Sequence, residues 1–200
     1  MFNSRSILLL LLVLTISVIS ASCTLCNNGY KQYLIEEGIA HFSFEYPCSY
    51  DKSGSEINND DGFTHIMLQG PYHKDVEDFT LISIFVIDSD DPDFLKPERR
   101  LNNAISLYET FLDYRLIERS SVNVAGIEGQ QILYFYNKER PEIGDAGYIP
   151  GAGPAPTIAR DIYFSDEGYL WNITIFSNES TAKADMADFE HMLETFTILN

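Results

Sequence analysis

The sequence has few residues of the kinds that build common catalytic and metal sites. Its four histidines have neither H-x-x-x-H nor H-E-x-x-H spacing. It has no G-x-S-x-G motif, and no cysteine pairs with a plausible general base. We therefore expect no catalytic residue, no metal ligand and no cofactor, and a protein that is not an enzyme.

Basic residues are also scarce, with 13 Lys and Arg against 30 Asp and Glu and a net charge of -17. Such a surface repels phosphate backbones, so nucleic acid is excluded as a partner. Anionic lipid headgroups would repel it as well. Any attachment to a membrane therefore needs a covalent anchor.

The chain has one long apolar run, Ile7 to Ile19, and it follows the single positive charge of Arg5. Small residues follow at Ser20-Ala21-Ser22. This order of a positive residue, an apolar run and small residues is that of a secretory signal peptide. The apolar run is too short, and too often interrupted by Ser and Thr, for a spanning helix. We expect residues 1–22 to be removed and the protein to be exported.

Cys23 directly follows the small residues. This arrangement resembles a bacterial lipobox, in which the cysteine becomes the lipid-bearing first residue. The resemblance implies a membrane anchor at Cys23 on the outer face of the cytoplasmic membrane. The alternative is ordinary cleavage and a secreted protein. Loss of Arg5 with the signal peptide changes the net charge from -17 to -18.

The two other cysteines, Cys26 and Cys48, are predicted to form a disulfide, because an exported chain meets oxidising conditions. The bond would pin a tether over residues 23–36 to the end of the first strand, just after Pro47. In the alternative both remain reduced. The C-x-x-C formed with Cys23 lies at the cleavage site rather than at the start of a helix, so we reject redox catalysis.

The end of the chain predicts a hairpin covered by a helix. Two runs of aromatic and β-branched residues, 158–164 and 169–176, flank the turn at Asp166-Glu167-Gly168. The period then changes from two to about 3.6, which predicts an amphipathic helix over 181–195. Alternation and apolar runs predict five further strands, at 40–46, 63–69, 79–87, 116–124 and 127–136, and a helix at 97–112.

Three polar or irregular segments separate these elements. Residues 50–62 are predicted to be a turn-rich connection whose acidic residues do not fit an EF-hand register. Asp88 to Asp93 is expected to be a solvated acidic turn rather than a cation site. Residues 139–157, rich in Gly and Pro, are predicted to be a mobile loop that is dispensable for folding, because loop-closure entropy varies slowly with length.

Several segments together resemble the PsbP-like family. They are Phe42 to Pro47, Thr80 to Ile87, Gly168 to Trp171 and Met192 to Ile198, so the resemblance covers most of residues 37–200. It implies an α/β fold, an α/β/α sandwich whose central, mainly antiparallel sheet has about seven strands with helices packed on it. A tether over 23–36 precedes this domain. No motif carries a functional site from the family to this chain.

The sequence therefore favours an exported, lipid-anchored, non-catalytic domain that binds or helps to assemble a membrane-associated protein partner. One alternative is a carrier of a small ligand, which an apolar cavity would favour. Another is a hydrolase whose site is not legible in the sequence, which a deep pocket with convergent, pKa-perturbed groups would favour. An exposed flat apolar patch would favour protein binding.

Overall fold

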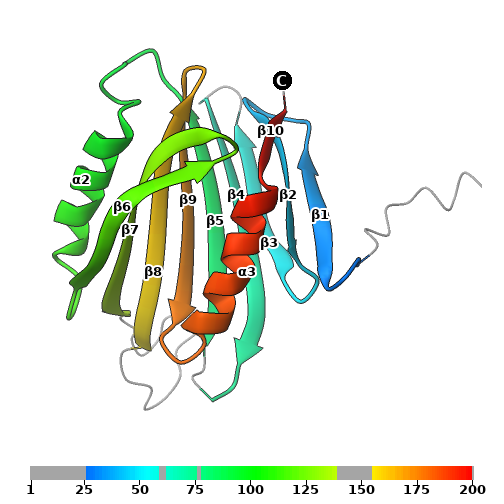
Figure 1. Ribbon diagram of the computed structural model, residues 1–200, viewed down its shortest axis with the longest axis vertical. Coiled ribbons are helices and arrows are strands. Elements are labelled where there is room, and N and C mark those ends of the chain that lie inside the picture. The colour runs from blue at the N-terminus through cyan, green and yellow to red at the C-terminus, as the bar shows by residue number, and fades with distance from the viewer. Residues whose placement is uncertain (1–25, 59–61, 76–77, 139–154, 200) are drawn as a thin grey trace, which may run out of the picture.

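The computed structural model describes residues 26–58, 62–75, 78–138 and 155–199 (Figure 1). In chain order the elements are β1 (Tyr30–Ile35), β2 (His41–Pro47), β3 (Asp51–Asn58), β4 (Phe63–His73), β5 (Asp78–Asp88), α2 (Pro97–Tyr108), β6 (Arg115–Val124), β7 (Ile127–Lys138), β8 (Ala155–Asp166), β9 (Tyr169–Asn178), α3 (Ala182–Thr195) and β10 (Thr197–Leu199).

These strands form two sheets. The large sheet has seven strands in the order β3-β4-β5-β9-β8-β7-β6, and the small sheet has three in the order β1-β2-β10. Every strand pair is antiparallel. The prediction of an α/β fold with a mainly antiparallel sheet of about seven strands is therefore confirmed.

The membership of the large sheet differs from the prediction at one edge. The strand expected at 40–46 is β2 and belongs to the small sheet. The seventh strand of the large sheet is instead β3, in the segment predicted to be a polar turn, and that prediction is wrong. β3 is an edge strand whose main chain pairs with β4, from Asp51 opposite Gln69 to Asn58 opposite Phe63. Pairing at an edge uses main-chain groups and needs no alternation of apolar side chains.

Two tight turns close hairpins where the sequence predicts them. Ala125 and Gly126 have φ of 53° and 85°, and Glu167 and Gly168 have φ of 47° and 92°. Positive φ at two successive residues is the geometry of the two-residue hairpin turn that matches the twist of the flanking strands. These turns set the registers of β6 with β7 and of β8 with β9.

The main core lies on one face of the large sheet, beneath α3 and the small sheet. Its largest side chains are fully buried aromatic rings, among them Phe42, Phe164 and Trp171. The ring of Trp171 stacks on Phe164, with centroids 5.5 Å apart, and meets Phe42 edge-on at 5.2 Å. Phe196, just after α3, completes this cluster. The small sheet and α3 are thus held to the large sheet by shared aromatic packing.

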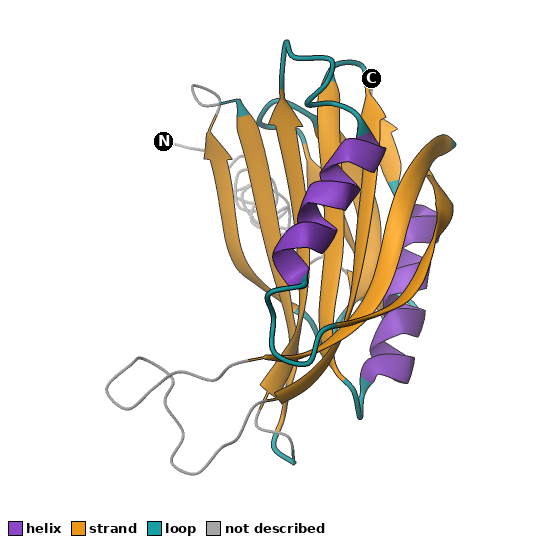
Figure 2. Ribbon diagram, turned by 90° about the vertical axis from the view of Figure 1, so that its left-hand side faces the viewer, coloured by secondary structure: helices purple, strands orange, loops and turns teal. Residues whose placement is uncertain are grey.

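A second, smaller core lies on the opposite face, beneath α2. Leu101 on the helix packs with Ile132, Tyr134 and Ala159 of the sheet. Figure 2 shows α2 and α3 on opposite sides of the large sheet, which is the sandwich that the sequence implied. We call the face under α3 the inner face and the face under α2 the outer face.

Strands occupy parts of two segments that were predicted to be irregular. Tyr30–Ile35, expected to be part of the tether, forms β1 and pairs with β2 from Tyr30 opposite Pro47. β8 begins at Ala155, so the last three residues of the predicted 139–157 loop belong to a strand. Residues 139–154 lie outside the described part of the chain, and the prediction for them stays open.

Candidate functional site: the open part of the outer face

The outer face is apolar over a wider area than α2 covers. α2 contacts β7 and β8. Beside it, on β4 and β5, the outward residues of each strand are half-buried, whereas their inward neighbours are buried. We call these outward side chains the open face; they are Phe63, His65, Met67, Gln69, Phe79, Leu81, Ser83, Phe85 and Ile87.

The open face is mostly apolar, and contacts across the two strands join its side chains. Phe63 and Phe85 lie with ring centroids 5.5 Å apart, and His65 meets Phe85 edge-on at 5.3 Å. A hydrogen bond across its middle joins the imidazole of His65 to the hydroxyl of Ser83 at 2.9 Å. Half-exposed aromatic and aliphatic side chains gathered on adjacent strands form the kind of surface that binds proteins.

A shallow cleft of about 300 Å³ marks the boundary between the open face and α2. Its walls are apolar, with Phe85 and Ile87 from β5 and Leu107 from α2. Leu107, the next-to-last residue of α2, is 59% exposed. Arg100 enters the same cleft, with its guanidinium stacked on Phe94, 3.2 Å from the ring centroid. The cleft therefore joins apolar walls to one cationic group.

A buried acid lies beneath α2, in the layer under this cleft. Asp161 on β8 is fully buried and accepts a hydrogen bond of 2.5 Å from the hydroxyl of Tyr108 on α2. Burial raises the pKa of Asp161 to about 6, and hydrogen bonds from Tyr108 and Thr174 act in the opposite direction. Burial, followed by the negative charge of Asp161, raises the pKa of Tyr108 and Tyr134 as well.

This tyrosine and aspartate cluster is part of the packing between α2 and the sheet. The rings of Tyr108 and Tyr134 stack with centroids 4.6 Å apart. Sequence reasoning does not single out Asp161, because Arg160-Asp161 reads as an ordinary charged pair in a strand. The one available signal is that Ala159 and Tyr163, two residues away on either side, place Asp161 on the apolar outer face.

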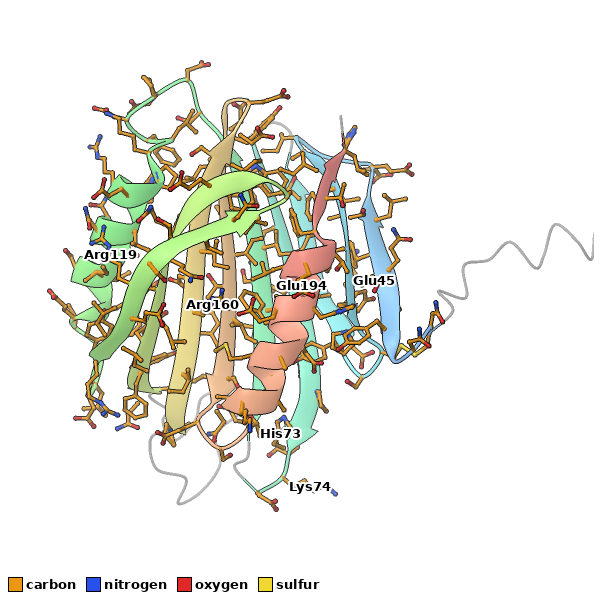
Figure 3. The ribbon with its side chains drawn as sticks, viewed as in Figure 1. Glu45, His73, Lys74, Arg119, Arg160 and Glu194 are labelled. Atoms are coloured by element: carbon orange, nitrogen blue, oxygen red, sulfur yellow. A yellow bond between two sulfur atoms is a disulfide. The ribbon has the colours of Figure 1, made fainter. Side chains whose placement is uncertain are left out.

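The inner face has a polar groove beside α3, of about 280 Å³. Arg160 projects into it from β8 (Figure 3) and donates hydrogen bonds to Gln131, at 2.9 Å, and to Glu190 of α3. It also lies over the ring of Phe189, 5.6 Å from the centroid. Through these contacts Arg160 joins α3 to the sheet. We therefore interpret Arg160 as a structural residue rather than a binding residue.

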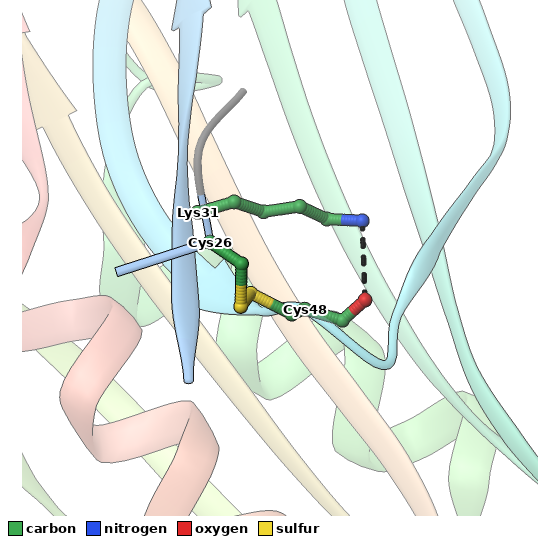
Figure 4. The surroundings of a disulfide bond; sticks show 3 residues. All are labelled: Cys26, Lys31 and Cys48. Atoms are coloured by element: carbon green, nitrogen blue, oxygen red, sulfur yellow. Dashed lines mark hydrogen bonds between the residues drawn. A yellow bond between two sulfur atoms is a disulfide. The ribbon is translucent and has the colours of Figure 1, made fainter. Parts of the chain in front are cut away.

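Cys26 and Cys48 are joined by a disulfide in the structure, with Cα atoms 5.9 Å apart (Figure 4). The amide of Cys48 donates to the carbonyl of Gly29, and the ammonium of Lys31 donates to the carbonyl of Cys48. The first described residue is thereby held against the end of β2. Cys23 lies outside the described residues, so its lipidation stays a prediction.

Other kinds of site are not found in the described part of the chain. There, no group of three or more His, Cys, Asp or Glu could hold a metal ion. Over the same residues, no helix is long and apolar enough to cross a membrane.

Comparison with solved structures identifies the architecture. LpqN, which is involved in cell envelope biogenesis of Mycobacterium tuberculosis, matches 86% of this chain and 93% of its own, with a TM-score of 0.54 and 11% identity. Cyanobacterial PsbP (CyanoP) from Synechocystis matches 90% of this chain and 99% of its own, with a TM-score of 0.53 and 12% identity. The chain has the PsbP-like fold.

The same fold occurs in the Ran-binding protein Mog1p of Saccharomyces cerevisiae, which matches 86% of this chain and 96% of its own, with a TM-score of 0.50 and 8% identity. No protein-family model matches the sequence. No curated protein matches it either. At these identities the PsbP-like fold is what is shared, and the site has to be argued from this chain's own residues.

Proposed function

We propose that this PsbP-like chain is an exported, lipid-anchored, non-catalytic domain that binds a protein partner through the open face. The observation that carries the proposal is the row of half-exposed apolar side chains on β4 and β5 that α2 leaves uncovered. A monomeric soluble protein rarely exposes a large contiguous apolar surface without a use for it.

The acidic residues around the open face indicate what charge the partner's surface should carry. β5 ends at Asp88, and the connection to α2 carries Asp90 and Asp91, all three exposed. Electrostatic complementarity favours a partner that places basic groups beside its apolar contact. We therefore expect a protein surface that is apolar at its centre and basic at its rim, in keeping with a chain whose net charge is -17.

The proteins that share the fold support a binding role. The mycobacterial protein is involved in cell envelope biogenesis, and the yeast protein binds Ran. Tyr108 and Tyr163, whose pKa values burial raises, line the cleft beside α2, but this cleft is shallow and the buried Asp161 does not line it. The deep pocket that would favour the hydrolase alternative is therefore not found among the described residues.

The test is site-specific crosslinking in the native cell, followed by introduction of a charge on the open face. A photoreactive residue at Met67 should crosslink to one defined protein, and Met67→Lys should abolish recovery of that protein without lowering the thermal midpoint of unfolding. Leu34, 51% exposed on β1, supplies the matched control position. The same crosslink from Leu34, or equal loss of the partner in Leu34→Lys, would overturn the assignment to the open face.

The cleft beside Arg100 favours one second candidate, a carrier of a small ligand. A cleft of about 300 Å³ with apolar walls and one guanidinium suits a small apolar molecule that bears a carboxylate. Native mass spectrometry of protein taken from its own membrane would show the extra mass of such a ligand. In that case Arg100→Ala should release it, while Met67→Lys should not.

A further inference from the structure

The long elements run along one axis, so the surface divides between two ends (Figure 1). We call the end with the β2–β3, β4–β5 and β9–α3 turns the anchor end, because Cys26 and its disulfide lie there. The far end holds the β1–β2 turn, the β5–α2 connection and the β8–β9 hairpin. The antiparallel registers fix this division, since His73 pairs with Asp78 at one end and Asp88 with Tyr169 at the other.

Charge is distributed unequally between the two ends. Among the described residues the far end carries ten carboxylates, which are Glu36, Glu37, Asp88, Asp90, Asp91, Asp93, Glu98, Glu128, Asp166 and Glu167. Four cationic side chains accompany them, Lys96, Arg99, Arg100 and Arg119, the last of which pairs with Glu98.

Among the described residues the anchor end is closer to balance. Its six cationic side chains are Lys31, Lys52, Lys74, Arg115, Lys138 and Lys183. Its eight carboxylates are Asp51, Asp75, Asp78, Glu109, Asp113, Glu179, Asp185 and Asp188. Anionic headgroups therefore repel the described part of the far end more strongly than that of the anchor end, over a distance of about 10 Å at moderate salt.

Exposed apolar side chains also gather at the anchor end. Tyr72 is 53% exposed, Leu112 43%, Leu116 45% and Ile117 52%. Figure 3 shows Lys74 at the lower end of the molecule, just past the end of β4 and two residues after Tyr72. An exposed tyrosine beside a lysine is the combination that proteins place at the level of lipid headgroups.

The length of chain before the disulfide limits how far this end can stand from a lipid at Cys23. Cys26 is fixed to Cys48, and only three peptide units separate it from Cys23. Fully extended, three residues span at most about 11 Å. A lipid on Cys23 would therefore hold Cys26 and the end of β2 within that distance of the bilayer surface.

We propose that the anchor end is a membrane-contacting surface, on which Tyr72 and Lys74 touch the lipid headgroups while the acidic far end points away. This inference rests on the lipid anchor of the proposed function. It adds an orientation, in which the strands stand on the membrane and the open face is turned sideways toward a partner in the same membrane.

The test is quenching of an added tryptophan by a nitroxide carried on lipid headgroups. The chain from Cys23 to Asn200, with its disulfide intact, is coupled through Cys23 to a phospholipid and placed in vesicles of phosphatidylcholine and phosphatidylglycerol. Tyr72→Trp reports on the anchor end, and Glu128→Trp is the matched control on an exposed strand position at the far end. Trp171 is buried and gives a constant background.

On vesicles without the nitroxide, we expect the emission of Tyr72→Trp to shift to shorter wavelength. On vesicles with the nitroxide, the emission of Tyr72→Trp should be quenched, while Glu128→Trp keeps its emission. Replacing both Cys26 and Cys48 by Ser lengthens the free tether to Tyr30 and should reduce that difference. Equal quenching of the two reporters, or stronger quenching of Glu128→Trp, would overturn the orientation. Because the lipid is attached chemically and no partner is present, this result is independent of whether the cell lipidates Cys23 and of whether the open face binds a protein.

Discussion

Asp161 is the residue whose environment departs most from that of an ordinary surface acid. It is fully buried on β8, and burial raises its pKa from the ordinary value of about 4 to about 6. The folded state therefore binds this proton more tightly than the unfolded state. Stability from this residue is present at low pH and is lost as pH rises from about 4 to about 6, which amounts to a cost on the order of 3 kcal/mol above that range.

We predict that Asp161→Asn removes this pH dependence. The amide can still accept the hydrogen bond from Tyr108, and it carries no charge to bury. The free energy of unfolding of the variant, measured in urea from pH 4 to pH 8, should exceed that of the native chain at pH 8 and match it more closely at pH 4.

Tyr108→Phe serves as the opposing control, because it removes the donor to Asp161 and leaves the carboxylate in place. Its loss of stability should be larger at pH 8 than at pH 4. If Asp161→Asn and the native chain show the same change between pH 4 and pH 8, the carboxylate is not buried as described.

At the scale of elements, β1 depends on a covalent contact that α2 and α3 do not need. It pairs with β2 on one side only, and it is an edge strand of the small sheet. The disulfide joins the residues just before β1 to the residue just after β2 and encloses a separation of 22 residues. Cross-linking a loop of this length restricts the unfolded chain and stabilises the fold by about 3 kcal/mol.

We predict that the purified protein has no reactive thiol at Cys26 or Cys48 until it is reduced. The double variant Cys26→Ser, Cys48→Ser should lower the free energy of unfolding by about 3 kcal/mol, and reduction of the native chain should lower it equally. Thiol labelling and urea unfolding measure the two quantities. Two reactive thiols without reductant, or equal stability of the double variant, would contradict the bond.

At the scale of the whole molecule, the charge decides how the protein can meet a membrane. A chain with 30 acidic and 13 basic residues is repelled by anionic lipids, so any attachment to such a membrane needs a covalent anchor. One acyl chain gives marginal binding, and two or more hold firmly. The Cys23 anchor and the unequal charge of the two ends would together keep the domain upright.

We predict that Cys23→Ala moves the protein from the membrane fraction to the soluble fraction. Thr24→Ala, at the neighbouring residue, should leave it in the membrane fraction. The intact mass of the native protein should show acyl groups on Cys23. An unmodified Cys23 in membrane-bound protein would contradict the lipid anchor and leave the fold unaffected.

The sequence by itself determined the local elements. The alternation along Phe42 to Tyr46, the apolar run at 79–87 and the change of period after Asn178 each depend on neighbours in the chain, and β2, β5 and α3 form there. The turns at Gly126 and Gly168 follow from which residues accept positive φ. With the resemblance to the PsbP-like family, this was enough to predict the fold class.

Only the tertiary structure decided which strands share a sheet and which surface stays open. β10 pairs with β2, which is distant in sequence, and β3 is an edge strand that pairs with β4 through main-chain groups, so the side chains of both carry little signal. Asp161 is buried because α2 covers it. Met67 and Phe85 stay partly exposed because α2 does not cover that part of the sheet. Burial is a property of what packs on a residue, which in a sheet protein is set by contacts between segments far apart in the chain.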